Sequence, residues 1–330
     1  MLKLNFAAAS DRGLVRGNNE DSAYAGPYLL ALADGMGGHA AGEVASQLMI
    51  THLMGLDKNP RDNDMLALLG TVSAEANWSI AEHIRKHPET DGMGTTLTSM
   101  MFNGSQFAVC HAGDSRAYLL RDKKLQQVTK DDTYVQSLVD EGKLDPEDVT
   151  SHPQKSLILK AYNGRDVEPT LFLLDAQPGD RILLCSDGLS DPVTASTIES
   201  ALVAGSLEEV ANRLVELALR SGGPDNVTIV LADVVEASEE EVAELDALAA
   251  QSTNADTTEF AASEESPVIN PQAIMVGAIA GEVPEPTHPD SAASRAAALN
   301  RRPQVIEPYS GPATAAGAPR STVSPTGGNP

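Results

Sequence analysis

Short apolar runs separated by turn-forming residues are the feature of the first 236 positions that most limits the possible folds. Such runs, with Asn-Gly, Gly-Asp or Arg-Asp at the turns between them, are typical of antiparallel strands. Strands are expected at residues 2–6, 28–33, 95–102, 106–111, 116–120, 125–129, 170–174, 181–186 and 226–235. Apolar residues at helical spacing predict helices at 41–53, 64–86, 194–203 and 207–219. Strands interrupted by helix pairs predict an α+β fold with two antiparallel sheets covered by helices.

The composition changes after residue 236. Residues 237–330 hold 11 of the 20 prolines, and their only aromatic side chains are Phe260 and Tyr309. Such a stretch cannot bury enough apolar surface to offset the entropy lost on folding. We therefore expect a folded domain over residues 1–236 and a disordered tail over 237–330, in which the acidic run at 238–248 can form one short helix.

The chain is strongly acidic, with 47 acidic and 23 basic residues and a formal net charge of −24. The tail contributes 13 acids and 4 bases, a net −9, which leaves 34 acids and 19 bases, a net −15, for residues 1–236. Such a charge repels nucleic acid and anionic membranes and favours cations as partners. Charge alone does not distinguish scattered solvating groups from carboxylates gathered at one site.

The cysteines and the apolar segments indicate the compartment. Cys110 and Cys185 each lie within an apolar run, so we interpret them as buried free thiols of a reducing compartment. No stretch reaches the ~18 consecutive apolar residues of a membrane helix, and the first residues lack a signal-peptide pattern. The sequence therefore predicts a cytoplasmic protein without a membrane span.

An aspartate stands beside a glycine at the ends of four predicted strands, at Asp34, Asp114, Asp187 and Asp225. Glycine lets the backbone turn sharply, and hard divalent cations take oxygen ligands from carboxylates, carbonyls and water. Each aspartate taken singly is better explained as a turn residue, but four together favour a cation site. Near the N-terminus, Arg16 can either form a local ion pair with Glu20 and Asp21 or hold a phosphate while both carboxylates face a metal.

Six motifs follow one another along the chain: Arg16-x-x-Asn-Glu-Asp21, Asp34-Gly-Met-Gly-Gly38, Gly92-Met-Gly-Thr-Thr96, Gly113-Asp-Ser-Arg116, Ser186-Asp-Gly-Leu-Ser190 and Gly223-Pro-Asp-Asn226. In this order they resemble the metal-dependent protein phosphatases of type 2C, the PPM family. The sequence is especially similar to the bacterial serine/threonine phosphatases of that family, and among them to the actinobacterial ones that oppose receptor-like kinases. Each motif alone is weak, but all six in order are specific, and the resemblance covers about residues 5–235.

The resemblance implies a four-layer α-β-β-α sandwich, in which a central antiparallel β-sandwich is flanked by helix pairs. It implies two Mn²⁺ or Mg²⁺ ions, with a third often found in bacterial members, held by Glu20, Asp34, the carbonyl of Gly35, Asp114, Asp187 and Asp225. It also implies catalytic roles for Arg16 in phosphate binding, for Asp21 and Asn226 in orienting water, and for His39. Residues 130–167 would form a mobile flap beside the active site.

The sequence leaves open which group acts as the general acid. Eukaryotic members carry His directly after the bridging Asp-Gly, where this chain has Met36. His39 can protonate the leaving group or contact the substrate, or it can be only a first-turn residue of the helix that follows, and metal-bound water is the other candidate acid. His111 and His152 are expected to be structural or flap residues, and neither cysteine is expected to act in catalysis.

The implied activity is hydrolysis of phosphoserine and phosphothreonine in proteins by a monomer that reverses Ser/Thr kinase signalling, with phosphorylated proteins and the kinases themselves as partners. Two cations about 3.5–4 Å apart activate a bridging water and stabilise the phosphoryl transition state. A catalytically dead phosphoprotein-binding scaffold is a competing function, but no metal ligand is missing. A hydrolase of small phosphoesters or nucleic acid is another, which the net charge of the folded part disfavours.

In the resembled actinobacterial phosphatases, a juxtamembrane linker leads to a membrane span. The proline-rich residues 267–330 are a candidate for such a linker, so the chain is expected to be membrane-tethered if it belongs to a longer protein.

Overall fold

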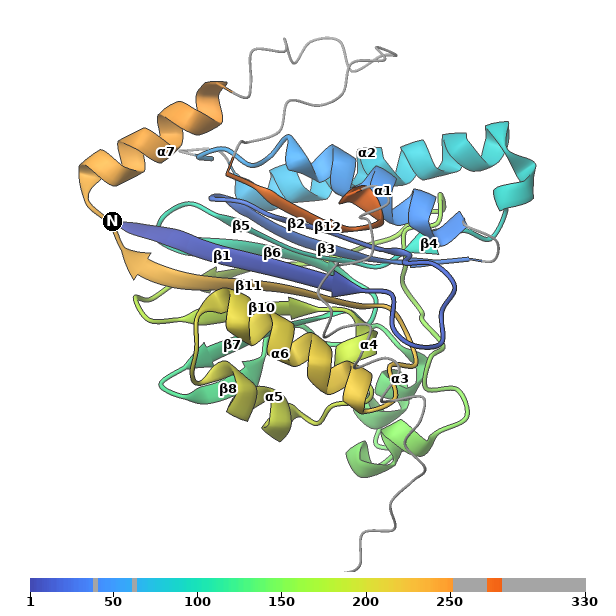
Figure 1. The fold of residues 1–330 in the computed structure, drawn as a ribbon. Coiled ribbons are helices and arrows are strands. Elements are labelled where there is room, and N and C mark those ends of the chain that lie inside the picture. The colour runs from blue at the N-terminus through green and yellow to red at the C-terminus, as the bar shows by residue number, and fades with distance from the viewer. Residues whose placement is uncertain (38–40, 61–63, 252–271, 281–330) are drawn as a thin grey trace, which may run out of the picture. The chain divides into compact units, whose positions relative to one another are not determined.

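The computed structural model describes residues 1–37, 41–60, 64–251 and 272–280 (Figure 1). All of these residues belong to one compact unit. Within this unit, two sheets pack face to face and helices cover their outer surfaces (Figure 1).

Each sheet is antiparallel throughout. The first has the order β1 (Leu2–Asp11), β11 (Val227–Glu236), β10 (Arg181–Cys185), β7 (Arg116–Arg121) and β8 (Lys124–Gln127). The second has the order β12 (Ile274–Gly277), β2 (Asp21–Ala25), β3 (Leu29–Met36), β5 (Leu97–Phe102), β6 (Gln106–Ala112) and β9 (Thr170–Asp175), with β4 (Gly94–Thr95) paired to β3.

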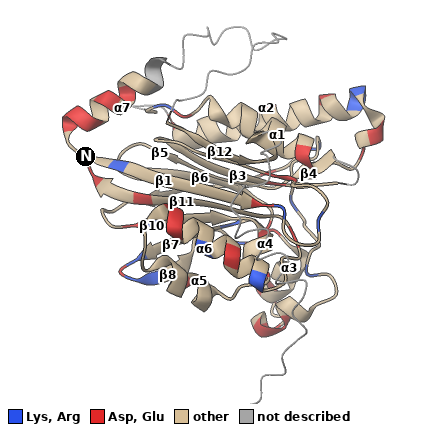
Figure 2. Ribbon diagram, in the orientation of Figure 1, with Lys and Arg blue, Asp and Glu red and all other residues tan. Residues whose placement is uncertain are grey.

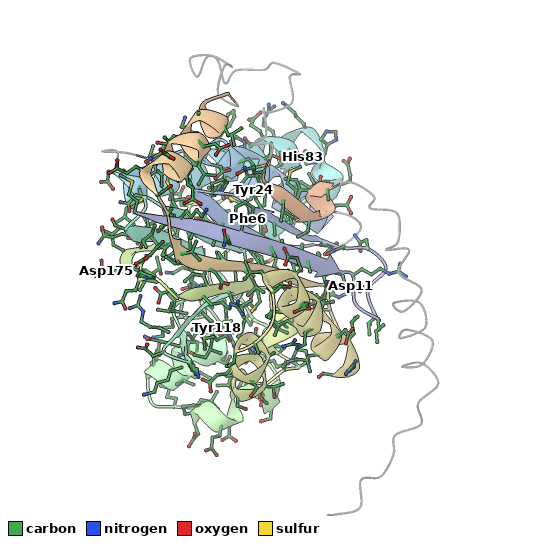
Figure 3. The ribbon with its side chains drawn as sticks, turned by 60° about the vertical axis from the view of Figure 1, so that its left-hand side comes forward. Phe6, Asp11, Tyr24, His83, Tyr118 and Asp175 are labelled. Atoms are coloured by element: carbon green, nitrogen blue, oxygen red, sulfur yellow. The ribbon has the colours of Figure 1, made fainter. Side chains whose placement is uncertain are left out.

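Helices bury the outer face of each sheet. The second sheet carries α1 (Ala41–Met54) and α2 (Met65–Lys86), and the first carries α4 (Asp187–Ser190), α5 (Ala195–Leu202) and α6 (Leu207–Arg220). Tyr24 of β2 and Tyr118 of β7, which Figure 3 labels, belong to these two outer apolar layers, whereas Leu30, Phe107 and Val230 fill the layer between the sheets. The predicted four-layer α-β-β-α sandwich is therefore confirmed.

Local sequence sets the helix ends. The Asp64 side chain caps α2 by accepting the backbone N–H groups of Leu66 and Ala67 at 3.0 and 3.2 Å. Ser206 and Glu209 form a capping box at the start of α6. The buried residues of α6 recur at helical spacing, as predicted, and are Leu207, Val210, Ala211, Leu214 and Ala218.

Within residues 1–236, β1 and β2 differ most from the sequence prediction. β1 continues to Asp11, because its ladder with β11 runs from the pair Leu2 and Glu236 to the pair Asp11 and Val227. No strand is predicted at β2, since its residues Asp-Ser-Ala-Tyr-Ala include no β-branched side chain. They are nevertheless all buried, because β2 lies between β12 and β3. Tertiary pairing thus overrides local preference.

The expected flap is more regular than its polar sequence indicates. The sequence predicts no helix at residues 130–167, but the structure has α3 (Tyr134–Asp140) and a 3-10 helix (Pro146–Ser151) there. The side chains of Thr133 and Asp145 cap these helices. Caps are short-range signals that a search for apolar periodicity misses. The mobility of the segment stays a prediction.

Two elements lie within the expected tail. α7 (Glu239–Gln251) confirms the short acidic helix, and its first turn lies near the N-terminus (Figure 2), where Lys3 of β1 contacts Glu241 at 2.6 Å. Strand β12, in contrast, corrects the prediction of disorder for its residues. The proline-rich average of the tail hides the short apolar run Ala-Ile-Met-Val.

The remaining tail residues, 252–271 and 281–330, lie outside the described ranges, so the domain division at residue 236 stays a prediction. Within the described ranges, no helix has the length and apolar character needed to cross a membrane.

Removing a side chain between the two sheets should cost far more stability than removing an exposed one. Leu30→Ala, at a fully buried position, should lower the free energy of unfolding by about 3 kcal/mol through lost burial and a residual cavity. Leu173→Ala, at a site 50% exposed, should change it by less than about 1 kcal/mol. Urea denaturation measures both, and equal losses would contradict this assignment of the core.

Candidate active site

Two predicted site residues face each other across neighbouring strands. Asp21 is the first residue of β2, and the strand register pairs it directly with Asp34 of β3. Directly opposed residues project to the same face of a sheet. Ser186 donates to Asp21 Oδ2 at 2.8 Å, and the Asp34 backbone N–H donates to Thr96 Oγ1 at 3.0 Å. Strand pairing therefore holds two carboxylates close together.

A second group forms where the β1–β2 loop meets the loop before β11. Arg16 contacts Asp225 through Nη2 and Oδ2 at 2.6 Å. The Asn226 side chain joins the loops: its Oδ1 accepts the Glu20 backbone N–H at 2.8 Å, and its Nδ2 donates to the carbonyls of Arg12 and Asn18 at 2.9 and 2.8 Å. These bonds fix Glu20 beside the loop that carries Asp225.

Asp114 and Asp187 complete the acidic cluster. Asp114 lies in the turn between β6 and β7, and Asp187 begins α4 directly after β10. Both line a cavity of about 80 Å³ that flap residues also line. Lys155 of the flap contacts Asp191 at 2.7 Å on the wall of this cavity.

Glycines at two of the Asp-Gly pairs let the backbone segments approach. A Cβ at Gly35 would lie 2.5 Å from the carbonyl oxygen of Glu20, and one at Gly188 would lie 1.9 Å from that of Asn226. No larger residue fits either position without moving the backbone. The glycine after Asp34 and the glycine after Asp187 are thus needed to bring the loops against the strands.

Burial and mutual repulsion raise the pKa values of these acids. Withdrawal from water is the main cause, and it raises the pKa of Asp21 to about 6 and that of Asp114 to about 7. The pKa of Asp34 lies well above its ordinary value because of burial and the charges of Asp21, Asp187, Asp114 and Asp225. Burial followed by the charge of Asp114 does the same at Asp187, and burial also raises the pKa of Glu20.

The cluster fits divalent cations. Asp21 Oδ1 and Asp114 Oδ1 are buried without a hydrogen-bond partner, although buried polar atoms normally have one. A cation would satisfy such oxygens and offset the repulsion. In the parts of the chain that the structure covers, no three His, Cys, Asp or Glu side chains form a preformed cage. Mg²⁺ does not need one, since it keeps several waters and takes only one or two carboxylates.

The predicted site residues that the structure describes gather at this end of the sandwich, and they are Arg16, Glu20, Asp21, Asp34, Gly35, Asp114, Asp187, Asp225 and Asn226. His39 lies outside the described residues. The individual roles of these residues stay predictions.

The sequence interpretation missed two hydroxyl residues that hold the acids in place. Ser186 Oγ accepts the Thr228 backbone N–H at 3.0 Å while it donates to Asp21. Thr96 Oγ1 bonds to Ser115 Oγ at 2.9 Å and accepts the Asp34 N–H. Both residues stand inside the six motifs, so a hydroxyl within such a motif was the available signal.

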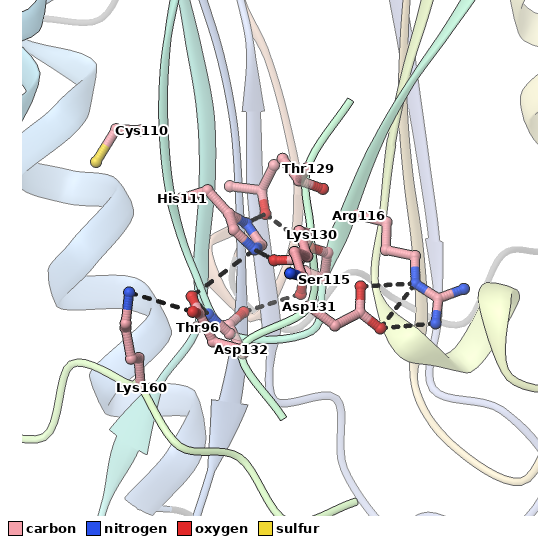
Figure 4. Close-up of polar contacts among 12 residues, drawn as sticks. Thr96, Cys110, His111, Ser115, Arg116, Thr129, Lys130, Asp131, Asp132 and Lys160 are labelled. Carbon is pink, nitrogen blue, oxygen red and sulfur yellow. Dashed lines mark hydrogen bonds and ion pairs between the residues drawn. The ribbon is translucent and has the colours of Figure 1, made fainter. Parts of the chain in front are cut away.

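His111 and the two cysteines have the surroundings expected of structural residues. His111 is buried (Figure 4), where Nδ1 bonds to Thr98 Oγ1 at 2.9 Å and Nε2 bonds to the Lys130 carbonyl at 3.0 Å. It therefore joins β6 to the start of the flap. Both cysteines are buried and free, as predicted, and burial raises the pKa of Cys185 to about 12.

The raised carboxyl pKa values predict that the cation-free protein loses stability as pH rises. The folded chain keeps a proton on Asp114 up to about pH 7, whereas its ordinary pKa is 3.8. This stabilising contribution is complete below the ordinary pKa and is lost as pH rises through the folded value. As pH rises through this range, the wild-type protein should lose on the order of 2–4 kcal/mol of its free energy of unfolding, and Asp114→Asn should not show this loss. Urea unfolding in a chelator at several pH values compares the two proteins, and identical slopes would contradict the prediction.

Known proteins resemble this chain in sequence and in structure. A family profile described as protein phosphatase 2C matches residues 18–222. The serine/threonine protein phosphatase PstP of Mycobacterium tuberculosis is 50% identical over 306 residues, which cover 93% of this chain and 54% of that protein. The serine/threonine phosphatase stp of Listeria welshimeri is 34% identical over 237 residues, 68% of this chain and 93% of that protein. The chain thus spans about half the length of the M. tuberculosis relative.

Solved structures of such phosphatases also resemble this chain. The M. tuberculosis PstP/Ppp crystal structure has a TM-score of 0.70 at 58% identity and covers 71% of this chain and 100% of that one. A structure of the PstP catalytic domain in complex with 2 manganese ions has a TM-score of 0.68 at 57% identity, over 72% of this chain and 100% of that one. From the four-layer fold, the acidic cluster and these similarities, we conclude that the chain belongs to the protein phosphatase 2C family.

Proposed function

We propose that the chain is a metal-dependent phosphatase that hydrolyses phosphoserine and phosphothreonine in proteins. The observation that carries the proposal is the gathering of buried, mutually repelling carboxylates next to the guanidinium of Arg16. An acidic cluster alone would repel a phosphate. A site that binds cations and also offers an arginine fork suits a phosphate monoester.

Mn²⁺ or Mg²⁺ ions would be held by Glu20, Asp34, the carbonyl of Gly35, Asp114, Asp187 and Asp225. Support comes from the unpartnered Oδ1 of Asp114 and from the manganese ions in the PstP complex. Bound divalent cations supply Lewis acidity, which lowers the pKa of the attacking water and offsets the phosphoryl charge.

Arg16 binds the substrate phosphate in this proposal. Its side chain is exposed, so a phosphoprotein can reach it, and the Asp225 carboxylate holds one edge of the guanidinium at 2.6 Å. The remaining N–H groups of the guanidinium can donate to phosphate oxygens in a bidentate arrangement. Asp225 thus orients the arginine as well as contributing to the cation site.

Asp21 and Asn226 act mainly by positioning. Ser186 donates to Oδ2 of Asp21, which leaves Oδ1 to accept from a water in the site. Both N–H groups of the Asn226 side chain already donate to backbone carbonyls, so only its Oδ1 can accept a further bond. The proton for the departing Ser or Thr oxygen comes from His39 or from water in the site, as the sequence leaves open.

The natural partners are phosphorylated Ser/Thr proteins, with the opposing Ser/Thr kinases among them, and the enzyme acts as a monomer. We place it in the cytoplasm, either free or tethered through the tail if the chain belongs to a longer protein. The greater length of the PstP relative supports the tethered form. Fractionation of the native host would contradict tethering if all of the protein were soluble.

Two competing functions give different results in one assay. A catalytically dead scaffold would bind a phosphothreonine peptide without releasing phosphate. A phosphatase for small esters or nucleic acid would turn over nucleotides or DNA faster than phosphopeptides. The folded, Mn²⁺-loaded protein should release phosphate fastest from phosphopeptides, because the net charge of −15 over residues 1–236 repels polyanions.

Asp34→Asn should abolish most of the activity. The substitution keeps the shape of the side chain but removes the charge at the centre of the acidic cluster, so we expect kcat to fall on the order of 10³-fold at saturating Mn²⁺. Phosphate release from a phosphothreonine peptide measures the effect. Asp175→Asn, on the exposed end of β9, is the matched control and should keep full activity. An active Asp34→Asn protein would refute the assignment.

Arg16→Ala should weaken substrate binding more than it slows turnover. The lost contacts are made to the phosphate in both the ground state and the transition state, so KM should rise about tenfold while kcat falls less. Arg220→Ala, which removes an exposed guanidinium paired with Glu216, should leave both parameters unchanged. A fall in kcat alone, with KM unaltered, would exclude phosphate binding as the main role of Arg16.

A further inference from the structure

We propose that residues 272–280, which lie beyond the matched family region, form a working part of the catalytic unit: they close the edge of β2 and thereby position Glu20 and Asp21. That residues 272–280 close the edge of β2 is argued from strand pairing and packing alone. The link from this edge to catalysis rests on the proposed function. The segment is 36 residues or more past the end of the predicted domain at residue 236.

Strand β12 is built into both apolar layers around the second sheet. It pairs antiparallel with β2, from Ile274 opposite Ala25 to Gly277 opposite Ser22. Ile274 and Val276 pack against the layer between the sheets, whereas Ala273, Met275 and Ile279 pack against the layer under α1 and α2. All four residues of β12 are half-buried, and this alternation is that of an edge strand that packs on two faces, not of a chain lying loosely on a surface.

The end of β12 touches the backbone of the site itself. Gly277 has φ +79°, and a Cβ there would lie 2.2 Å from the carbonyl oxygen of Asp21. Glycine is therefore required for this approach on both conformational and steric grounds. Just beyond, Gln47 of α1 donates to the Ala278 carbonyl at 2.7 Å, which anchors the segment to the helix.

Two hydrogen bonds connect the residue opposite Gly277 with Glu20, a predicted metal ligand. Ser22, opposite Gly277, bonds through its hydroxyl to Ser46 Oγ at 2.9 Å. Ser46 in turn donates to the Glu20 carbonyl at 2.6 Å. Asp21 and Asp34 are opposite each other in the same ladder, so β2 is held on one side by β3 and on the other by β12.

Without β12, β2 would be an edge strand with unpaired backbone groups directly at the site. Edge strands open locally at a lower free energy than central strands. Cations would then have to order β2 as they bind, which lowers their apparent affinity. The tail thus couples to the catalytic centre through strand pairing, without contacting the substrate.

Adding a single methyl group at Gly277 tests this proposal in the 330-residue chain. Gly277→Ala should displace β12 from β2. Gly179→Ala is the matched control, because Gly179 also has a left-handed φ, of +89°, but a Cβ there meets no atom within 4 Å. Hydrogen exchange of the β2 amides should be about tenfold faster or more in Gly277→Ala and unchanged in the control. Calorimetry should show Mn²⁺ binding weakened severalfold in Gly277→Ala only.

Each outcome bears on a separate part of the proposal. If β2 exchange is equal in Gly277→Ala and in wild type, β12 does not protect this edge, and the inference is overturned. If β2 exchanges faster but Mn²⁺ affinity is unchanged, the positioning of Glu20 and Asp21 is overturned. Protection of β5 and β10 reports whether the variant is otherwise folded. Since exchange and calorimetry need no turnover, an inactive wild-type protein would count against the proposed function and leave this inference intact.

Discussion

Repulsion among carboxylates at one end of the β-sandwich is the constraint on which the rest of the structure depends. The charges of several other aspartates repel that of Asp34, and burial raises the free-energy cost of ionising each carboxyl. If the acids stood on flexible loops, the repulsion would move them apart. The fold prevents that by placing the aspartates at the ends or turns of strands whose central residues are fully buried. Three apolar layers therefore supply the rigidity that keeps the repelling groups together and ready for cations.

Particular polar and glycine residues hold the acids in place. Asp21 is held by Ser186, Glu20 by Asn226, and the loops around them close only because Gly35 and Gly188 lack side chains. Within the six motifs, a hydroxyl and an amide thus bond to the segments that carry the carboxylates, and two glycines let these segments approach one another.

The fold class, and the gathering of the predicted acids at one end of the sandwich, could be predicted because they rest on short-range patterns, whereas the roles of these acids stay predictions. Apolar runs ending in Asp-Gly mark β3 and β10, and helical periodicity marks α2 and α6. The errors occur where long-range pairing decides. Only the tyrosine of Asp-Ser-Ala-Tyr-Ala favours a strand by itself, and the segment becomes one because β3 and β12 lie on either side of it. The run 274–277 is too short to stand out from its proline-rich surroundings. Likewise, the flap helices depend on caps at Thr133 and Asp145 rather than on an apolar face.

The acids divide into two groups according to what supports them. Glu20, Asp21 and Asp34 depend on β2 and β3, and through β2 on the tail strand. Asp114 and Asp187 line the cavity beside the flap, where Asp132 donates its backbone N–H to the Gly113 carbonyl at 2.7 Å and Lys155 contacts Asp191. A change in the tail would therefore reach the first group, and a change in the flap the second. Because Asp187 and Asp34 interact through their charges, a cation bound to either group lowers the repulsion felt by the other. Two distant segments of the chain can thus influence one centre through separate supports that meet only in the electrostatics of the site.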